Sequence, residues 1–117
     1  MFVNWGKCTG GHWCNLLRLN LNDNYFDNIS GVYIIWHGGN SPKTVKVGQG
    51  DIKDRLLKHS ADPEILQYKN LTLYVSWATL SSNYMDGVEK YLGESLKPLV
   101  GSIFPDVNPI SVNFPWS

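Results

Sequence analysis

The sequence has no excess of charge of either sign and no long hydrophobic run. Its 117 residues include 10 lysines and arginines and 10 aspartates and glutamates, so the formal net charge is zero. This balance argues against a strongly basic clamp that neutralises many nucleic-acid phosphates, but it allows a local basic patch. The longest apolar run, Val32–Trp36, is far shorter than the roughly 20 residues of a membrane helix. Residues Met1–Gly10 lack a signal-peptide pattern, so we expect a cytoplasmic protein without a membrane partner.

Cysteine is also scarce, because the chain has only Cys8 and Cys14, which flank His12. A Cys-x3-His-x-Cys cluster invites a zinc interpretation, but the spacing matches no common zinc module and no fourth ligand stands out. Two cysteines in a cytoplasmic chain are more often reduced thiols. We therefore expect free thiols, and we keep binding of a metal or a protein partner by this cluster as the less favoured alternative.

Apolar residues, by contrast, make up 43% of the chain and charged residues only 17%. Such a composition predicts a folded chain rather than disorder, and the length fits one domain with its own core. The first twelve residues include Gly6, Gly10 and Gly11, so residues 1–12 are expected to form a flexible N-terminal arm. Residues 13–117 are expected to form a single domain, whose proline-rich end is an extended tail over the core.

Residue patterns predict a small α+β domain with a mostly antiparallel sheet flanked by helices. Alternating or β-branched and aromatic residues indicate strands over residues 13–21, 31–37, 44–48 and 71–78. The second and third of these strands are close enough to form a hairpin. Capping residues predict helices over about 52–59, from 63 onward and over about 83–96. Pro98 is expected to end the last helix.

Several polar residues follow one another in a suggestive order along these elements. Arg55 and His59 are four residues apart and share a helix face. The other features are Gly31-Val32-Tyr33 at the start of one hairpin strand, Lys46-Val47-Gly48 at the end of the other, and Glu89 nine residues before Pro98. This order and spacing resemble the GIY-YIG nuclease family over roughly residues 31–101. In that family two short strand motifs form a hairpin, followed by a helix with an arginine and a helix with a glutamate that ends in proline.

The sequence departs from the family pattern at two functional positions. Lys46 stands where the family has its second tyrosine, although a polar group there still lies near the scissile phosphate. Gly101 occupies the position of an asparagine that often follows the proline. Asn113 is the candidate to supply that amide after an insertion, and a loop asparagine is the alternative.

The resemblance implies metal-dependent hydrolysis of phosphodiester bonds, with DNA as the expected substrate and Mg²⁺ or Mn²⁺ as the cofactor. Glu89 would hold the metal, since Mg²⁺ can be bound by one carboxylate while it keeps several waters. Arg55 and Lys46 would contact the phosphate, with Asn113 as a further substrate contact. Tyr33 would accept a proton from water, and His59 would assist as a base or phosphate ligand. We expect Tyr33, Lys46, Arg55 and Glu89 to converge on one face of the sheet.

Simpler roles are open for the same residues. Tyr33 fits a core position, Arg55 and His59 fit a solvated helix face, and most helix carboxylates are surface charges. The alternative function is a catalytically degenerate GIY-YIG-like domain that binds nucleic acid or protein. The sequence shows no attached DNA-binding domain, so a nuclease of this kind would be weakly specific, form a homo-oligomer or use a protein partner. Most tryptophans are expected in the core, with Trp5 and Trp116 as candidates for an exposed role.

Overall fold

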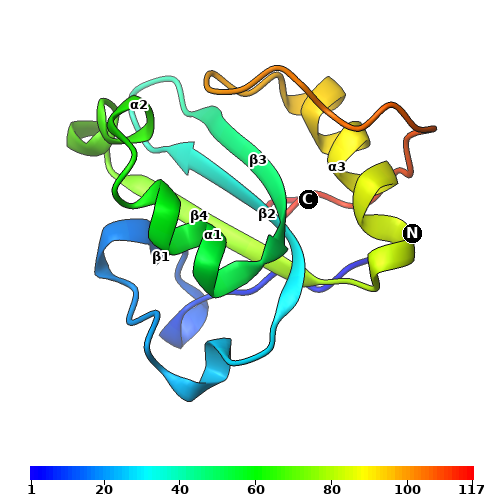
Figure 1. Cartoon of the computed structure of the whole chain (residues 1–117). Helices are drawn as coiled ribbons and strands as arrows, with labels where there is room; N and C mark the ends of the chain where they lie inside the picture. The colour runs from blue at the N-terminus through cyan, green and yellow to red at the C-terminus, as the bar shows by residue number, and fades with distance from the viewer.

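The chain folds into a four-stranded antiparallel sheet with helices on both sides, which confirms the predicted α+β class (Figure 1). A computed structural model describes all 117 residues. The strands, in the spatial order β1-β4-β2-β3, are β1 (Cys14–Asn15), β4 (Leu73–Thr79), β2 (Ser30–His37) and β3 (Lys43–Asp51). The helices are α1 (Ile52–His59), α2 (Pro63–Leu66) and α3 (Ser82–Leu96), with short 3-10 helices at Thr9–Gly11, Leu16–Arg18, Asn24–Phe26 and Lys69–Leu71.

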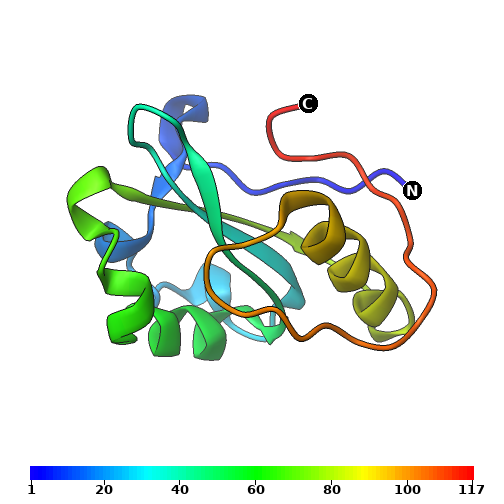
Figure 2. The same cartoon turned by 90° about the horizontal axis from the view of Figure 1, so that it is seen from above.

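Strand β2 lies in the middle of the sheet, and its side chains divide between two hydrophobic clusters. Successive residues of a strand point to opposite faces, so each face receives every second side chain. One cluster joins the sheet to α1 through Tyr33, Ile35, Ile52 and Leu56. The other joins it to α3 through Val32, Ile34, Val88 and Leu92. Helices α1 and α3 therefore cover different faces, on either side of the β2–β3 hairpin (Figure 2).

The helix boundaries follow the capping residues found in the sequence. The Asp51 side chain accepts a hydrogen bond of 3.0 Å from the backbone N–H of Asp54 and begins α1 as predicted. Pro63 opens α2 after the capping residue Asp62, as expected for a residue that lacks an N–H. Helix α3 ends at Leu96, before Pro98.

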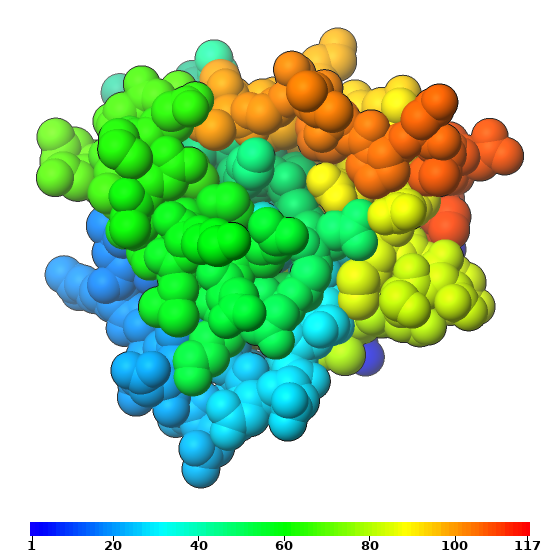
Figure 3. Space-filling view, in the orientation of Figure 1, coloured from blue at the N-terminus to red at the C-terminus, as the bar shows by residue number.

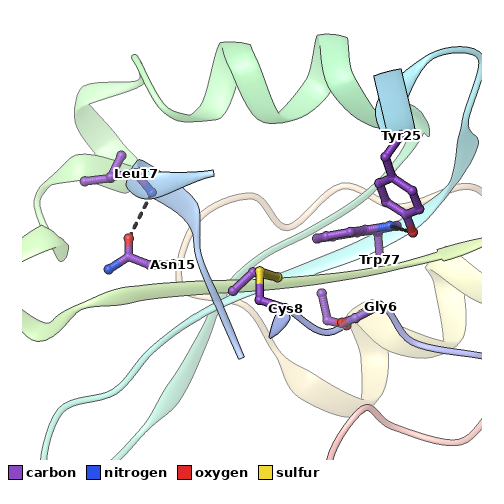
Figure 4. The surroundings of a disulfide bond; sticks show 8 residues. Gly6, Cys8, Asn15, Leu17, Tyr25 and Trp77 are labelled. Atoms are coloured by element: carbon purple, nitrogen blue, oxygen red, sulfur yellow. Dashed lines mark hydrogen bonds between the residues drawn. A yellow bond between two sulfur atoms is a disulfide. The ribbon is translucent and has the colours of Figure 1, made fainter. Parts of the chain in front are cut away.

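The strand predicted over residues 13–21 is wrong beyond its first residues. Only Cys14 and Asn15 pair with β4, and a 3-10 helix follows at once. The side-chain oxygen of Asn15 accepts a hydrogen bond of 3.0 Å from the backbone N–H of Leu17, as Figure 4 shows. Asparagine side chains offer the backbone such a partner in place of a strand neighbour, and this local bond overrides the alternating pattern.

The N-terminal residues 1–12 are not the loose arm that their glycines suggest. Gly6 donates a backbone hydrogen bond of 2.7 Å to the Trp77 carbonyl, so the segment lies along the edge of β4. Val3 is buried, and its N–H bonds to the side chain of Asn113 at 2.8 Å. The segment therefore runs beside the C-terminal tail, where the blue and red ends meet in Figure 2. The bond between Val3 and Asn113 joins residues 110 positions apart, which no local pattern reveals.

Cys8 and Cys14 form a disulfide, so the prediction of two reduced thiols is wrong (Figure 4). The chain turns back between them because Gly10 and Gly11 both adopt left-handed conformations, with φ of 74° and 75°. Cys8 then donates a backbone hydrogen bond of 2.8 Å to the His12 carbonyl. With both sulfurs bonded to each other, the cluster offers no thiolate ligands, and the alternative of a zinc site there is excluded in this state.

Reduction of the Cys8–Cys14 disulfide should lower the free energy of unfolding by roughly 2 kcal/mol, because a short loop gains limited freedom when it opens. Chemical denaturation with and without a phosphine reductant measures this difference. The double substitution Cys8→Ser with Cys14→Ser is the matched control and should be insensitive to the reductant. Two thiols that react at once in the unreduced native protein would contradict the disulfide.

The C-terminal tail is extended, as predicted, and covers part of the free edge of β3. The backbone N–H groups of Leu99 and Val100 donate to the carbonyls of Thr44 and Val45 at 3.0 and 2.8 Å. Val112 anchors the tail in the α3-side core. None of the helices combines the length and the apolar character needed to cross a bilayer.

Candidate active site

A pocket of about 230 Å³ opens at the edge of β3, between α1, α3 and the tail. In Figure 3 this edge lies between α1 (green) and α3 (yellow), below the orange tail. The pocket is lined by Tyr33, Lys46, Gly48, Gln49, Arg55, His59 and Glu89, among others. The fold thus brings together five of the six predicted site residues, from β2, β3, α1 and α3.

These residues do not share one face of the sheet, which corrects the predicted geometry. Lys46 pairs with Ile35 across the hairpin, so it lies on the α1 face together with Tyr33. Glu89 comes from α3, which covers the other face. The two groups meet because β3 is the edge strand, and the pocket extends around its edge.

Gly48 makes room for the Tyr33 ring at the centre of the pocket. It lies directly opposite Tyr33 in the hairpin, and a Cβ atom there would overlap the Tyr33 hydroxyl. Tyr33 is only 2% exposed, so its ring has little freedom to move aside. A glycine in the strand therefore lets the phenol cross over β3 and reach α1.

Tyr33 and His59 form the closest polar contact of the site, with 2.5 Å between Oη and Nε2. Burial raises the pKa of the Tyr33 phenol above its usual value. Burial, reinforced by Lys46, lowers the pKa of His59 to about 4. Both groups are therefore neutral at pH 7, and the imidazole tautomer decides which of them donates. In the tautomer with a bare Nε2, the phenol donates to Nε2, and the Tyr33 oxygen can accept a hydrogen bond from a further group.

The depressed pKa of His59 makes the protein less stable in mild acid. The unfolded chain binds a proton near pH 6.5, whereas the folded chain binds it only near pH 4, so stability falls as the pH drops between these values. His59→Gln should show a smaller loss of stability over this window. Urea unfolding of both proteins from pH 7 to pH 4 tests this, and equal losses in both would contradict the assignment.

Glu89 is half-buried, and its carboxylate is held by a neighbour that the sequence analysis missed. The side-chain amide of Gln49 donates to Glu89 at 2.8 Å and to Asp86 at 2.6 Å. Burial raises the pKa of Glu89, while the Gln49 bond lowers it and Asp86 raises it again. In the sequence, only the position of Gln49 directly after the Lys46–Gly48 motif indicates that it could belong to the site.

The tail supplies a wall of the site that the sequence did not predict. Gly101 lies so close to Lys46 that a Cβ would be 2.6 Å from Nζ. The ring of Phe104 packs on Gly93, one turn after Glu89, and a Cβ at Gly93 would be 2.6 Å from it. Ile103 also lines the pocket and is 92% exposed.

Asn113 is not part of the site, so its predicted contact with substrate is not supported. Its side-chain oxygen accepts a hydrogen bond of 2.8 Å from the Val3 N–H, and its side-chain nitrogen donates one of 3.0 Å to the Val3 carbonyl. The Asn113 carbonyl accepts from the Trp5 indole at 2.8 Å. Asn113 therefore connects the N-terminal segment to the C-terminal tail. It is the loop asparagine of the alternative interpretation.

No family model, curated protein or solved structure matches the chain. The geometry and chemistry of the pocket are therefore the basis for a functional assignment.

Proposed function

We propose that the protein is a metal-dependent nuclease of the GIY-YIG type that hydrolyses phosphodiester bonds, with DNA as its substrate. The observation that carries this proposal is the convergence of Tyr33, Lys46, Arg55, His59 and Glu89 on one pocket. The pocket combines two cations, one carboxylate and a phenol–imidazole pair, which are the groups that phosphodiester hydrolysis needs. The two cations also make a local basic site on a chain without net charge.

The Tyr33–His59 pair provides a path for the proton of an attacking water. The Tyr33 oxygen takes a proton from the water while its own proton moves along the 2.5 Å hydrogen bond to His59 Nε2. The phenol is neutral before and after this transfer, and the imidazole ends as imidazolium. Burial and Lys46 disfavour that cation in the empty site, and the negative charge of a bound phosphate would offset them. Arg55 and Lys46 would stabilise the charge that develops on the phosphoryl oxygens.

Glu89 is suited to bind a magnesium or manganese ion, and it would be the only protein carboxylate among the ligands of that ion. It is an oxygen donor at the pocket wall, and a bound cation would favour its ionised form, which burial otherwise disfavours. Gln49 holds the carboxylate in place. When bound, the ion would act as a Lewis acid on the phosphoryl oxygens and lower the pKa of a bound water.

Incubation of the full chain with plasmid DNA and with single-stranded DNA, with and without Mg²⁺ or Mn²⁺, tests this proposal. We expect cleavage that requires the divalent ion and stops on chelation. Absence of cleavage of both substrates with either ion would reject the nuclease in favour of the alternative, a catalytically degenerate domain that binds nucleic acid or protein.

A further inference from the structure

A second and larger pocket, of about 580 Å³, lies next to the candidate active site and has a different chemistry. Three tryptophans contribute to its wall, and no acidic residue does. Two lysines, Lys43 and Lys97, are exposed at its rim. Aromatic walls with cations and no anions suit a planar ring attached to negative charge.

The tryptophans are arranged as walls around the pocket rather than as a closed stack. Trp36 from β2 is nearly buried, and Trp13 and Trp116 approach it edge-on, with ring centroids 5.3 and 5.5 Å away. Trp116 stacks on Phe114 and still leaves 48% of its surface exposed. A third cation, the Lys7 ammonium, lies 4.6 Å from the centre of the Trp13 ring. An exposed indole in such a setting is available to a ligand.

The same segments line both pockets. On β3, Thr44 lines the tryptophan pocket and Lys46 lines the candidate active site, and two residues of strand span about 7 Å. On the tail, Leu99 lines the first pocket and Gly101 the second. A polymer whose phosphate lies beside Lys46 therefore has its next residues within reach of the tryptophans.

We propose that the tryptophan pocket binds an unpaired base of the nucleic-acid substrate, with Lys43 and Lys97 on its phosphates. This inference rests on the proposed function and specifies its substrate, which is a strand with single-stranded bases next to the scissile phosphate. A base stacks on an indole whatever its identity, so the pocket selects structure rather than sequence. A paired base cannot enter, because its ring faces are covered by its neighbours in the duplex.

The test is binding of a fluorescent oligodeoxythymidylate and of a duplex of equal length to the metal-free protein, followed by anisotropy. We expect the parent to prefer the single strand, and Trp116→Ala to weaken that binding about tenfold, within the range measured for removal of one stacking aromatic. Duplex binding should change little. Tyr84→Ala is the matched control, because Tyr84 is an exposed aromatic that lines neither pocket, and it should bind like the parent.

Lys97→Glu provides a second variant on the surface, in case Trp116→Ala does not fold, and it should also weaken binding of the single strand. Equal binding of the single strand by the parent and by both pocket variants would overturn the proposal. So would displacement of the oligonucleotide by neutral N-acetyltryptophanamide but not by thymidine monophosphate, which would indicate a site for an apolar group of a protein. If the parent cleaves DNA but Trp116→Ala and Lys97→Glu bind the single strand as well as the parent does, the base pocket alone is rejected. If Trp116→Ala weakens binding but the parent does not cleave single-stranded DNA under Mg²⁺ or Mn²⁺, the nuclease alone is rejected.

Discussion

Glu89→Ala is expected to lower DNA cleavage by at least about a thousandfold. Glu89 is the only carboxylate that lines the pocket, and loss of the metal removes several kcal/mol of transition-state stabilisation, where each 1.4 kcal/mol is about tenfold in rate. Gel assays of plasmid cleavage under Mg²⁺ and Mn²⁺ measure the effect. Glu94→Ala is the matched control, because Glu94 is exposed on the same helix and makes only a 3.9 Å ion pair with Lys90.

The same substitution should leave the free energy of unfolding within about 1 kcal/mol of the parent. Gln49 keeps its bond to Asp86 at 2.6 Å, so no buried donor loses all its partners. Alanine also favours the helix more than glutamate does, and it removes a carboxylate whose ionisation burial disfavours. Metal-free binding to DNA should persist, because Lys46 and Arg55 remain. Full cleavage by Glu89→Ala would show that another group holds the metal.

The parts of the fold that the sequence predicted are those determined by local patterns. The run of β-branched and aromatic residues gives β2, and the Asp51 cap gives the start of α1. The spacing of Arg55 and His59 on one helix turn places both at the pocket. Each of these features depends on residues fewer than about ten positions apart, whose geometry follows from helix and strand periods.

The parts that the sequence did not predict depend on contacts between distant segments. Hydrogen bonds of Asn113 to Val3 fix the N-terminal residues, and no periodicity marks such a pair. The extension of the site around the edge of β3 follows from the order β1-β4-β2-β3, which needs the whole sheet. The role of Gln49 follows from that same edge, because its amide reaches across to α3.

The structure also explains how Tyr33 can be both a core residue and a site residue. Its ring belongs to the α1-side hydrophobic cluster and is almost fully buried. Its hydroxyl, however, extends past Gly48 into the pocket and bonds to His59. The core role and the proposed catalytic role therefore concern different atoms of one side chain, and a substitution that keeps the ring separates them.

Tyr33→Phe keeps the buried ring and removes only the hydroxyl, so it should lower cleavage by about 10² to 10⁴-fold, as removal of a positioned acid–base group does. His59 Nε2 then loses its partner, and the unpaired, partly buried nitrogen should cost about 1 kcal/mol of stability.

If Tyr33 and His59 act in one proton path, His59→Gln should lower cleavage similarly, and the double variant should be little worse than either single one. Cleavage rates of the three variants, with unfolding curves to confirm that each is folded, measure these effects. Tyr68→Phe is the matched control, since Tyr68 stacks on His37 at 5.6 Å and lines neither pocket. Unchanged cleavage by Tyr33→Phe would assign Tyr33 to the core alone and leave His59 without a proton to receive.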